Sequence, residues 1–242
     1  MARSLADARR WMQQGATLVS GALDGLDDEA FTAPTDLAGW TRAHVVAHLS
    51  ANADAVGNLV HWAATGQPTP MYASIEQRNA DIEAGSLLTG VKLTEWFNRS
   101  AATLDDAMAS LTGAQWEAEV VTAQGRTVPA SETPWMRSRE VMVHAVDLGT
   151  GIGFADLPAD FLDALCDDIA GKRSAGAGTP AAGPALVVVA TDSDGCWEIA
   201  GSGEPTAASG TLAAVTSYLA GRDASAVVMT NGEPAPALPA WL

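Results

Sequence analysis

Residues 136–149 constrain the fold more than any other segment, because they place two polar side chains at helical spacing within an apolar pattern. Glu140 and His144 are four residues apart, so on a helix both side chains project from one face. Residues 141–143 between them are all apolar, which predicts that other elements cover this helix. A carboxylate and an imidazole in a covered place need polar partners, because unpaired polar groups are costly to bury.

A divalent metal ion is one such partner, and residues 39–48 offer a further ligand on a second predicted helix. Two facing helices could supply two histidines and one glutamate and leave one coordination position open, as catalytic zinc sites do. The spacing does not choose between His44 and His48 as the third ligand. It also leaves open an ordinary i,i+4 pair of Glu140 and His144 on a solvated face, although polar flanks would be normal for such a pair.

Asp147 is a further candidate, because it lies three residues after His144 and can approach it on the same helix face. It could accept the second N–H of the imidazole, as carboxylates behind zinc-bound histidines do. The alternative is an ordinary residue at the end of a helix that Gly149 terminates. The pattern leaves both interpretations open.

Charge and composition narrow the class of protein. Hydrophobic residues make up 48% of the 242 residues and charged residues 17%, which is typical of a globular chain. The formal net charge is −16, from 29 acidic and 13 basic residues, so nucleic-acid binding is not expected. An anionic substrate would need a locally placed arginine.

The sequence predicts a cytoplasmic protein with no thiol nucleophile of its own. The N-terminus shows no apolar segment of a secretory signal, and the longest apolar runs are too short to span a bilayer. The two cysteines, Cys166 and Cys196, lie far from each other and from any base in the sequence. We expect both to be packing residues.

Apolar residues at helical spacing predict a bundle in the first part of the chain. We expect helices over residues 4–24, 41–65, from about 74, and 87–111. Residues 120–134 are expected to form an ordered loop that leads into the helix of Glu140 and His144. Antiparallel bundles commonly hold metal sites between facing helices.

The pattern changes after about residue 150. A helix is predicted over residues 159–172, followed by a low-complexity connector at 174–184. Beyond it we expect a helix over 211–220 and strands at 186–190, 196–199, 207–210 and 226–230. The predicted fold class is α+β, with a helical domain over residues 1–150 and a small α+β domain over residues 151–242.

Residues 39–63, 122–133 and 135–147 closely resemble the mycothiol-dependent maleylpyruvate isomerases, and residues 219–222 and 241–242 resemble them more weakly. The helical segments alone would indicate only the broader DinB-like metal-binding superfamily, whereas the loop at 124–133 is much more specific. The resemblance implies a DinB-like four-helix bundle fused to a smaller α/β domain.

The same resemblance implies that one zinc ion is held by His48, Glu140 and His144 and that Arg222 takes part in catalysis. The implied reaction converts 3-maleylpyruvate from cis to trans, giving 3-fumarylpyruvate in gentisate breakdown, with mycothiol as thiol cofactor. Our hypothesis is that a zinc-activated thiolate adds to the double bond, the bond rotates, and elimination gives the trans product. Arg222 would hold a substrate carboxylate or stabilise the developing enolate.

Four other arginines are candidates for binding mycothiol or a substrate carboxylate: Arg78, Arg126, Arg137 and Arg139. Surface ion pairing is the expected fate of most of them. The partners predicted from the sequence are therefore a small-molecule substrate and a low-molecular-weight thiol, and we expect a monomer that binds neither nucleic acid nor membrane.

Three alternatives have different consequences. A zinc-dependent mycothiol S-transferase would use the same metal and thiol on another electrophile. A non-catalytic metal-binding or ligand-binding protein would have a closed site of four ligands, completed by His44. A metal-dependent hydrolase would need a general base, for which Asp147 is the obvious candidate.

Overall fold

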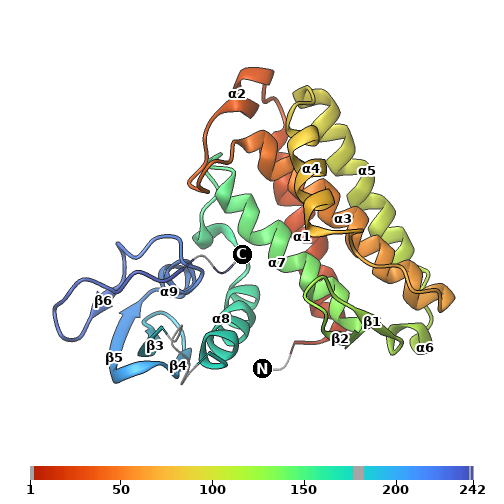
Figure 1. The fold of residues 1–242 in the computed structure, drawn as a ribbon. Coiled ribbons are helices and arrows are strands. Elements are labelled where there is room, and N and C mark those ends of the chain that lie inside the picture. Colours follow the sequence, from red (N-terminus) through yellow and green to blue (C-terminus); the bar gives the residue numbers. More distant parts are fainter. Residues whose placement is uncertain (1–2, 177–182, 240, 242) are drawn as a thin grey trace. The chain divides into compact units, whose positions relative to one another are not determined.

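The computed structural model describes residues 3–176, 183–239 and 241. The chain divides into two compact units (Figure 1). The first, Ser4–Ile152, is mainly helical, and the second, which contains Gly153–Leu242, combines helices with a four-stranded sheet. The predicted α+β fold class, with a helical bundle at the N-terminus, is confirmed. None of the helices within the described ranges is both long and apolar enough to cross a membrane.

Four long helices form the bundle of the first unit: α1 (Leu5–Leu23), α3 (Arg42–Thr65), α5 (Gly90–Ala109) and α7 (Thr133–Asp147). Helix α1 packs against α7 and α5, and α3 packs against α5 and α7. Three shorter helices connect them: α2 (Asp28–Thr32), α4 (Ile75–Ser86) and α6 (Gly113–Trp116). Helix α4 packs along α3 (Figure 1).

Local signals in the sequence set the ends of these helices. Helix α3 begins after Thr41 and ends at Gly66, whose φ of 74° lies in the left-handed region that glycine tolerates best. Helix α4 begins after Ser74, whose hydroxyl oxygen accepts a hydrogen bond from the backbone N–H of Gln77 at 3.1 Å. The predicted helix boundaries near residues 41, 65 and 74 are therefore confirmed.

Residues 120–134 differ from the prediction of a loop. Strands β1 (Glu119–Val121) and β2 (Thr127–Pro129) form an antiparallel hairpin, in which Val120 pairs with Val128. A 3₁₀ helix, η1 (Ala130–Glu132), then leads into α7. Strands of three residues are too short to show alternation in a sequence, which is why the hairpin was missed.

The second unit contains a mixed sheet with strand order β4-β3-β5-β6. Its elements are η2 (Phe154–Asp156), α8 (Ala159–Ser174), β3 (Pro184–Ala190), β4 (Cys196–Ile199), β5 (Ser202–Gly210), α9 (Leu212–Leu219) and β6 (Val228–Met229). Strands β3 and β5 run parallel, and the other neighbours are antiparallel. All the predicted elements of this part are present, although β5 begins five residues earlier than expected. Part of the connector predicted at 174–184 lies outside the described residues.

Candidate metal centre

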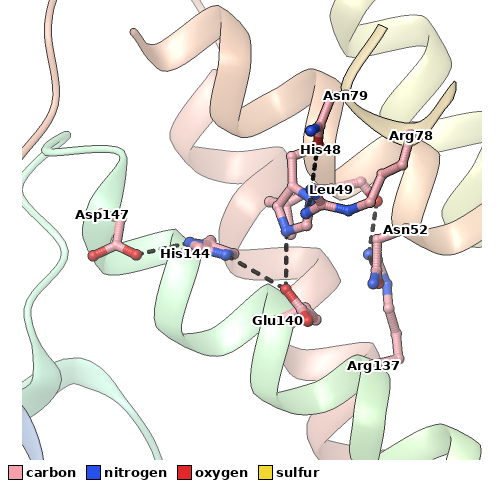
Figure 2. A network of polar contacts seen from close by, with 9 residues as sticks. All are labelled: His48, Leu49, Asn52, Arg78, Asn79, Arg137, Glu140, His144 and Asp147. Atoms are coloured by element: carbon pink, nitrogen blue, oxygen red, sulfur yellow. Dashed lines mark hydrogen bonds and ion pairs between the residues drawn. The ribbon is translucent and has the colours of Figure 1, made fainter. Parts of the chain in front are cut away.

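Three side chains from two helices point toward one another (Figure 2). His48 comes from α3, and Glu140 and His144 come from α7. Glu140 Oε2 lies 3.0 Å from His48 Nε2 and 3.4 Å from His144 Nε2. One ligand atom from each of the three residues lies within 4.8 Å of the others, a grouping that no other set of histidines, cysteines and carboxylates makes in the described chain.

The cluster lies in a covered part of the bundle. His48 is 5% exposed and His144 is 3% exposed, and residues 141–143 of α7 are fully buried, as their apolar pattern predicted. Helix α1 approaches α7 closely at Gly15, where a Cβ atom would come within 2.4 Å of a side-chain carbon of Val141. This close approach holds α7 from one side while α3 packs against it with His48.

The contacts within the cluster shift the pKa values of all three residues. Burial alone would raise the pKa of Glu140, but hydrogen bonds from His144 and His48 hold it well below its ordinary value. Burial lowers the pKa of His48, against the opposing effect of Glu140. Burial also opposes protonation of His144, but its hydrogen bonds to Asp147 and Glu140 raise its pKa to about 9. Glu140 is therefore held as a carboxylate, the form that binds metal ions.

Asp147 lies behind His144, which is one of the two interpretations that the spacing left open. Its Oδ2 atom is 2.7 Å from His144 Nδ1, and its side chain is buried. This contact directs the Nδ1 proton toward Asp147 and leaves Nε2 on the side of Glu140, which is how a carboxylate orients a metal-binding imidazole. Two imidazole nitrogens and one carboxylate form a donor set that suits zinc and leaves a coordination position for another ligand.

His44 belongs to the same helix but not to the cluster. Its Nδ1 accepts a hydrogen bond from the backbone N–H of Thr41 at 3.3 Å and so caps the first turn of α3. Its Nε2 lies 3.6 Å from Glu83 Oε2. Of the two histidines that the spacing left open, it is His48 that meets Glu140. A closed site completed by His44 has no support in this geometry.

Two further side chains contact His48, and neither contact was predicted. The ring of Trp40 lies 5.4 Å from the His48 ring, centroid to centroid. Arg78, on α4, places Nη2 at 3.2 Å from His48 Nδ1. Arg78 was one of four candidate arginines, and nothing in its sequence neighbourhood distinguishes it from the others.

Arg137 links the two helices that carry the cluster (Figure 2). It is only 1% exposed, and its Nη1 donates hydrogen bonds to the Leu49 carbonyl at 2.7 Å and to Asn52 Oδ1 at 2.8 Å. Burial lowers its pKa to about 10, so the guanidinium is still charged at neutral pH. Asn52 lies four residues after His48, and Arg137 three before Glu140, so helical spacing was a signal that could have identified this link.

Arg126 and Arg139 lie in different environments. Arg126 is exposed in the turn between β1 and β2. Arg139 is 9% exposed, and its Cζ atom lies 5.8 Å from the centre of the Trp135 ring. Arg137 and Arg139 are buried, so these two of the four arginines are not surface residues.

Arg222 belongs to the second unit and follows α9 directly. Gly221, with a φ of 68°, ends the helix, and the backbone N–H of Arg222 donates to the Ser217 carbonyl at 3.0 Å. The side chain is half-buried, and its Nη1 donates to the Ala220 carbonyl at 3.0 Å. The helix cap thus fixes the backbone from which this guanidinium projects.

The cysteines occupy contrasting positions in the second unit. Cys166 is buried, with Sγ 3.1 Å from Thr216 Oγ1, and burial raises its pKa to about 12. Cys196 is exposed on β4, so the prediction that it is a packing residue is wrong. The alternation along β4 buries Trp197 and Ile199 and leaves Cys196 on the outer face.

Comparison with known proteins decides the family. The family description "Mycothiol maleylpyruvate isomerase N-terminal domain" matches residues 12–149. Two solved structures, a mycothiol-dependent maleylpyruvate isomerase and a histidine-to-alanine mutant of it, are each 40% identical to this chain, with a TM-score of 0.91. The match covers 99% of this chain and 98% of each of theirs. The chain belongs to this family.

Membership of the mycothiol-dependent maleylpyruvate isomerase family confirms the resemblance drawn from the sequence. The structural match includes both units, whereas the family description covers only the region that contains the metal-binding candidates. The comparison with curated proteins gave no match.

Proposed function

We propose that this chain isomerises 3-maleylpyruvate to 3-fumarylpyruvate in gentisate breakdown and uses mycothiol as its thiol cofactor. The observation that carries the proposal is the meeting of His48, Glu140 and His144 in a chain similar over nearly its whole length to a mycothiol-dependent maleylpyruvate isomerase. That the protein is a cytoplasmic monomer remains a prediction from the sequence.

The three residues of the cluster would hold one zinc ion. Neutral imidazoles of His48 and His144 and the carboxylate of Glu140 would leave the ion with a net charge of +1, which favours an anionic fourth ligand. Asp147 keeps the proton of His144 on Nδ1, so the Nε2 lone pair is the one available for binding.

Bound zinc would lower the pKa of the mycothiol thiol, and the thiolate would add to the substrate double bond, permit rotation and leave again from the trans product. The residues of the chain supply the remaining requirements. Buried neighbours on α7 limit the access of water to the cluster, and the link from Arg137 to α3 keeps the two ligand-bearing helices in place. No cysteine of the chain has to act, because the nucleophile belongs to the cofactor.

Arg222 is the residue proposed to act on the substrate from the second unit. A guanidinium can hold a carboxylate through two parallel hydrogen bonds. Addition of a thiolate to the double bond moves negative charge onto the neighbouring carbonyl oxygen, and a cation that faces this oxygen would lower the barrier.

The test is to follow maleylpyruvate by its ultraviolet absorption with zinc-loaded protein, in the presence and absence of mycothiol. We expect fumarylpyruvate to form only when the thiol is present. If maleylpyruvate persists although zinc and mycothiol are shown to be bound, the isomerase proposal is wrong, and the S-transferase becomes the alternative to test with other electrophiles.

A further inference from the structure

Arg78 is a cation of the first unit that contacts a candidate metal ligand and no carboxylate among the described residues. Arg9 pairs with Asp105 and Arg10 pairs with Asp7, at 3.2 and 2.9 Å. Arg78 contacts neutral groups instead: the Nδ1 atom of His48, the side-chain oxygen of Asn79 at 3.1 Å, and the face of the Tyr72 ring. Within the described ranges, no carboxylate lies at ion-pair distance from it.

This arrangement is notable because the chain carries 29 acidic and only 13 basic residues. A half-buried guanidinium without a carboxylate partner, one hydrogen bond away from a candidate metal ligand, is in a position to attract an anion. The Tyr72 ring, 5.9 Å from Arg78 Cζ, supports one face of the guanidinium and limits its orientations (the edges that donate hydrogen bonds are not covered by the ring).

The contact between Arg78 and His48 depends on which nitrogen of His48 carries the proton. A guanidinium can only donate, so Nδ1 must accept from Arg78, and Nε2 then carries the proton and donates it to Glu140 at 3.0 Å. When Nε2 binds a metal ion, the neutral ring carries its proton on Nδ1 instead. Two donors would then face each other, so Arg78 must turn away from His48.

We propose that Arg78 binds a carboxylate group of the substrate next to the metal-binding cluster, and that metal binding by His48 makes it available for this role. The inference rests on the proposed function, because it assumes a carboxylate-bearing substrate at the cluster. A planar guanidinium matches a carboxylate better than an ammonium does, since it can donate two parallel hydrogen bonds. The substrate proposed above has two carboxylates, and Arg78 would bind one of them.

The experiment is a calorimetric titration of the zinc-loaded protein with maleate, a cis-unsaturated dicarboxylate, in the absence of thiol. We expect Arg78→Met to weaken maleate binding by about 10- to 100-fold, because it removes a hydrogen bond between charged groups. Arg78→Lys should weaken the binding less. The matched control is Arg99→Met, which removes an equal charge from an exposed position of α5 and should change the affinity less than about twofold.

The metal-free protein provides the second arm of the test. Because Arg78 then keeps its contact with His48, Arg78→Met should change maleate binding by less than about twofold. An equal loss of affinity with and without zinc would overturn the proposed dependence on the metal. Two results would overturn the binding role of Arg78 and leave a structural one. In the first, zinc-loaded Arg78→Met and Arg99→Met bind maleate with equal affinity. In the second, Arg78→Met loses its zinc.

The titration needs no turnover, so it is independent of the isomerase assay. If the wild-type protein fails to isomerise maleylpyruvate but binds maleate through Arg78, the proposed function fails and the carboxylate site stands. If isomerisation occurs and Arg78→Met changes neither KM nor maleate affinity, the proposed function stands and the carboxylate site fails.

Discussion

The cluster between α3 and α7 and the loop that carries Arg222 are built in opposite ways. The cluster is largely buried. Contacts between α3 and α7 hold it, Glu140 with His48 and Arg137 with Leu49 and Asn52, and the contact of His144 with Asp147 within α7 adds to them. Arg222 is half-buried, and its backbone is held by the cap of the single helix that precedes it.

This difference matches the different demands on the two regions. A metal site needs its ligand atoms at fixed distances, which packed helices supply. An arginine that binds a carboxylate tolerates more adjustment, because its long side chain can move to meet the ligand. We therefore expect substitutions in the cluster to affect metal binding, and substitution of Arg222 to affect turnover with the metal retained.

Glu140→Gln should have the largest effect. Residues behind a metal ligand typically contribute about 10- to 100-fold to metal affinity. Loss of a charged ligand should therefore lower zinc affinity by more than about 100-fold. Zinc content after dialysis against a weak chelator measures the change. The control is Glu83→Gln on α4, near His44, which should keep stoichiometric zinc; retention of zinc by Glu140→Gln would show that Glu140 is not a ligand.

Arg222→Met should lower turnover by about 100-fold, the usual cost of losing one group that stabilises an anionic transition state. Zinc content and thermal stability should match the wild type. Arg222→Lys keeps the charge but loses the paired hydrogen bonds, and it should recover only part of the rate. Turnover of Arg222→Met within a few-fold of the wild type would remove the second unit from the reaction.

Asp147→Asn should lower zinc affinity by about 10- to 100-fold, because the amide no longer accepts the His144 Nδ1 proton as a carboxylate does. Competition with a chromogenic chelator gives the affinity. An unchanged zinc affinity would mean that packing alone orients His144.

Arg137→Met should lower the free energy of unfolding by about 2 kcal/mol, because the Leu49 carbonyl and Asn52 Oδ1 lose their charged donor inside the core. Urea unfolding of the metal-free protein measures it. Arg126→Met, at an exposed turn, is the control and should change stability by less than about 0.5 kcal/mol. If Arg137→Met is as stable as the wild type, the link between α3 and α7 is not needed for folding.

Substitution of a cysteine should have the smallest effect on turnover. At pH 8, well below the Cys166 pKa of about 12, a thiol reagent should modify one thiol of the folded protein, the exposed Cys196, and two after denaturation. Cys196→Ser should leave turnover within about twofold of the wild type, as a surface substitution. Loss of turnover in Cys196→Ser would contradict a nucleophile supplied by the cofactor.

Features that depend on neighbouring residues could be predicted from the sequence. The ends of α3 follow from Thr41 and Gly66, and the shared face of Glu140 and His144 follows from their spacing. The alternation along β4 also indicates that Cys196 lies on the outer face, although we expected this residue to be a packing residue.

Features that depend on contacts between helices could not be predicted in this way. His44 and His48 are equivalent by helical spacing, and only the resemblance to a family favoured His48. The physical difference is that His44 lies in the first turn of α3, where its ring reaches the free N–H of Thr41. The contacts of Arg137 were likewise not predicted, since its acceptors lie on α3, 85 and 88 residues away in the sequence.

The central claim is that the cluster binds a metal ion with a position open to an external thiol. The most direct test is to replace zinc with cobalt, whose absorption reports its ligands, and to add mycothiol. We predict a new sulfur-to-cobalt charge-transfer band that saturates at one thiol per metal and is missing in Glu140→Gln. A cobalt spectrum that stays unchanged on adding mycothiol, in protein that holds one cobalt per chain, would contradict the account.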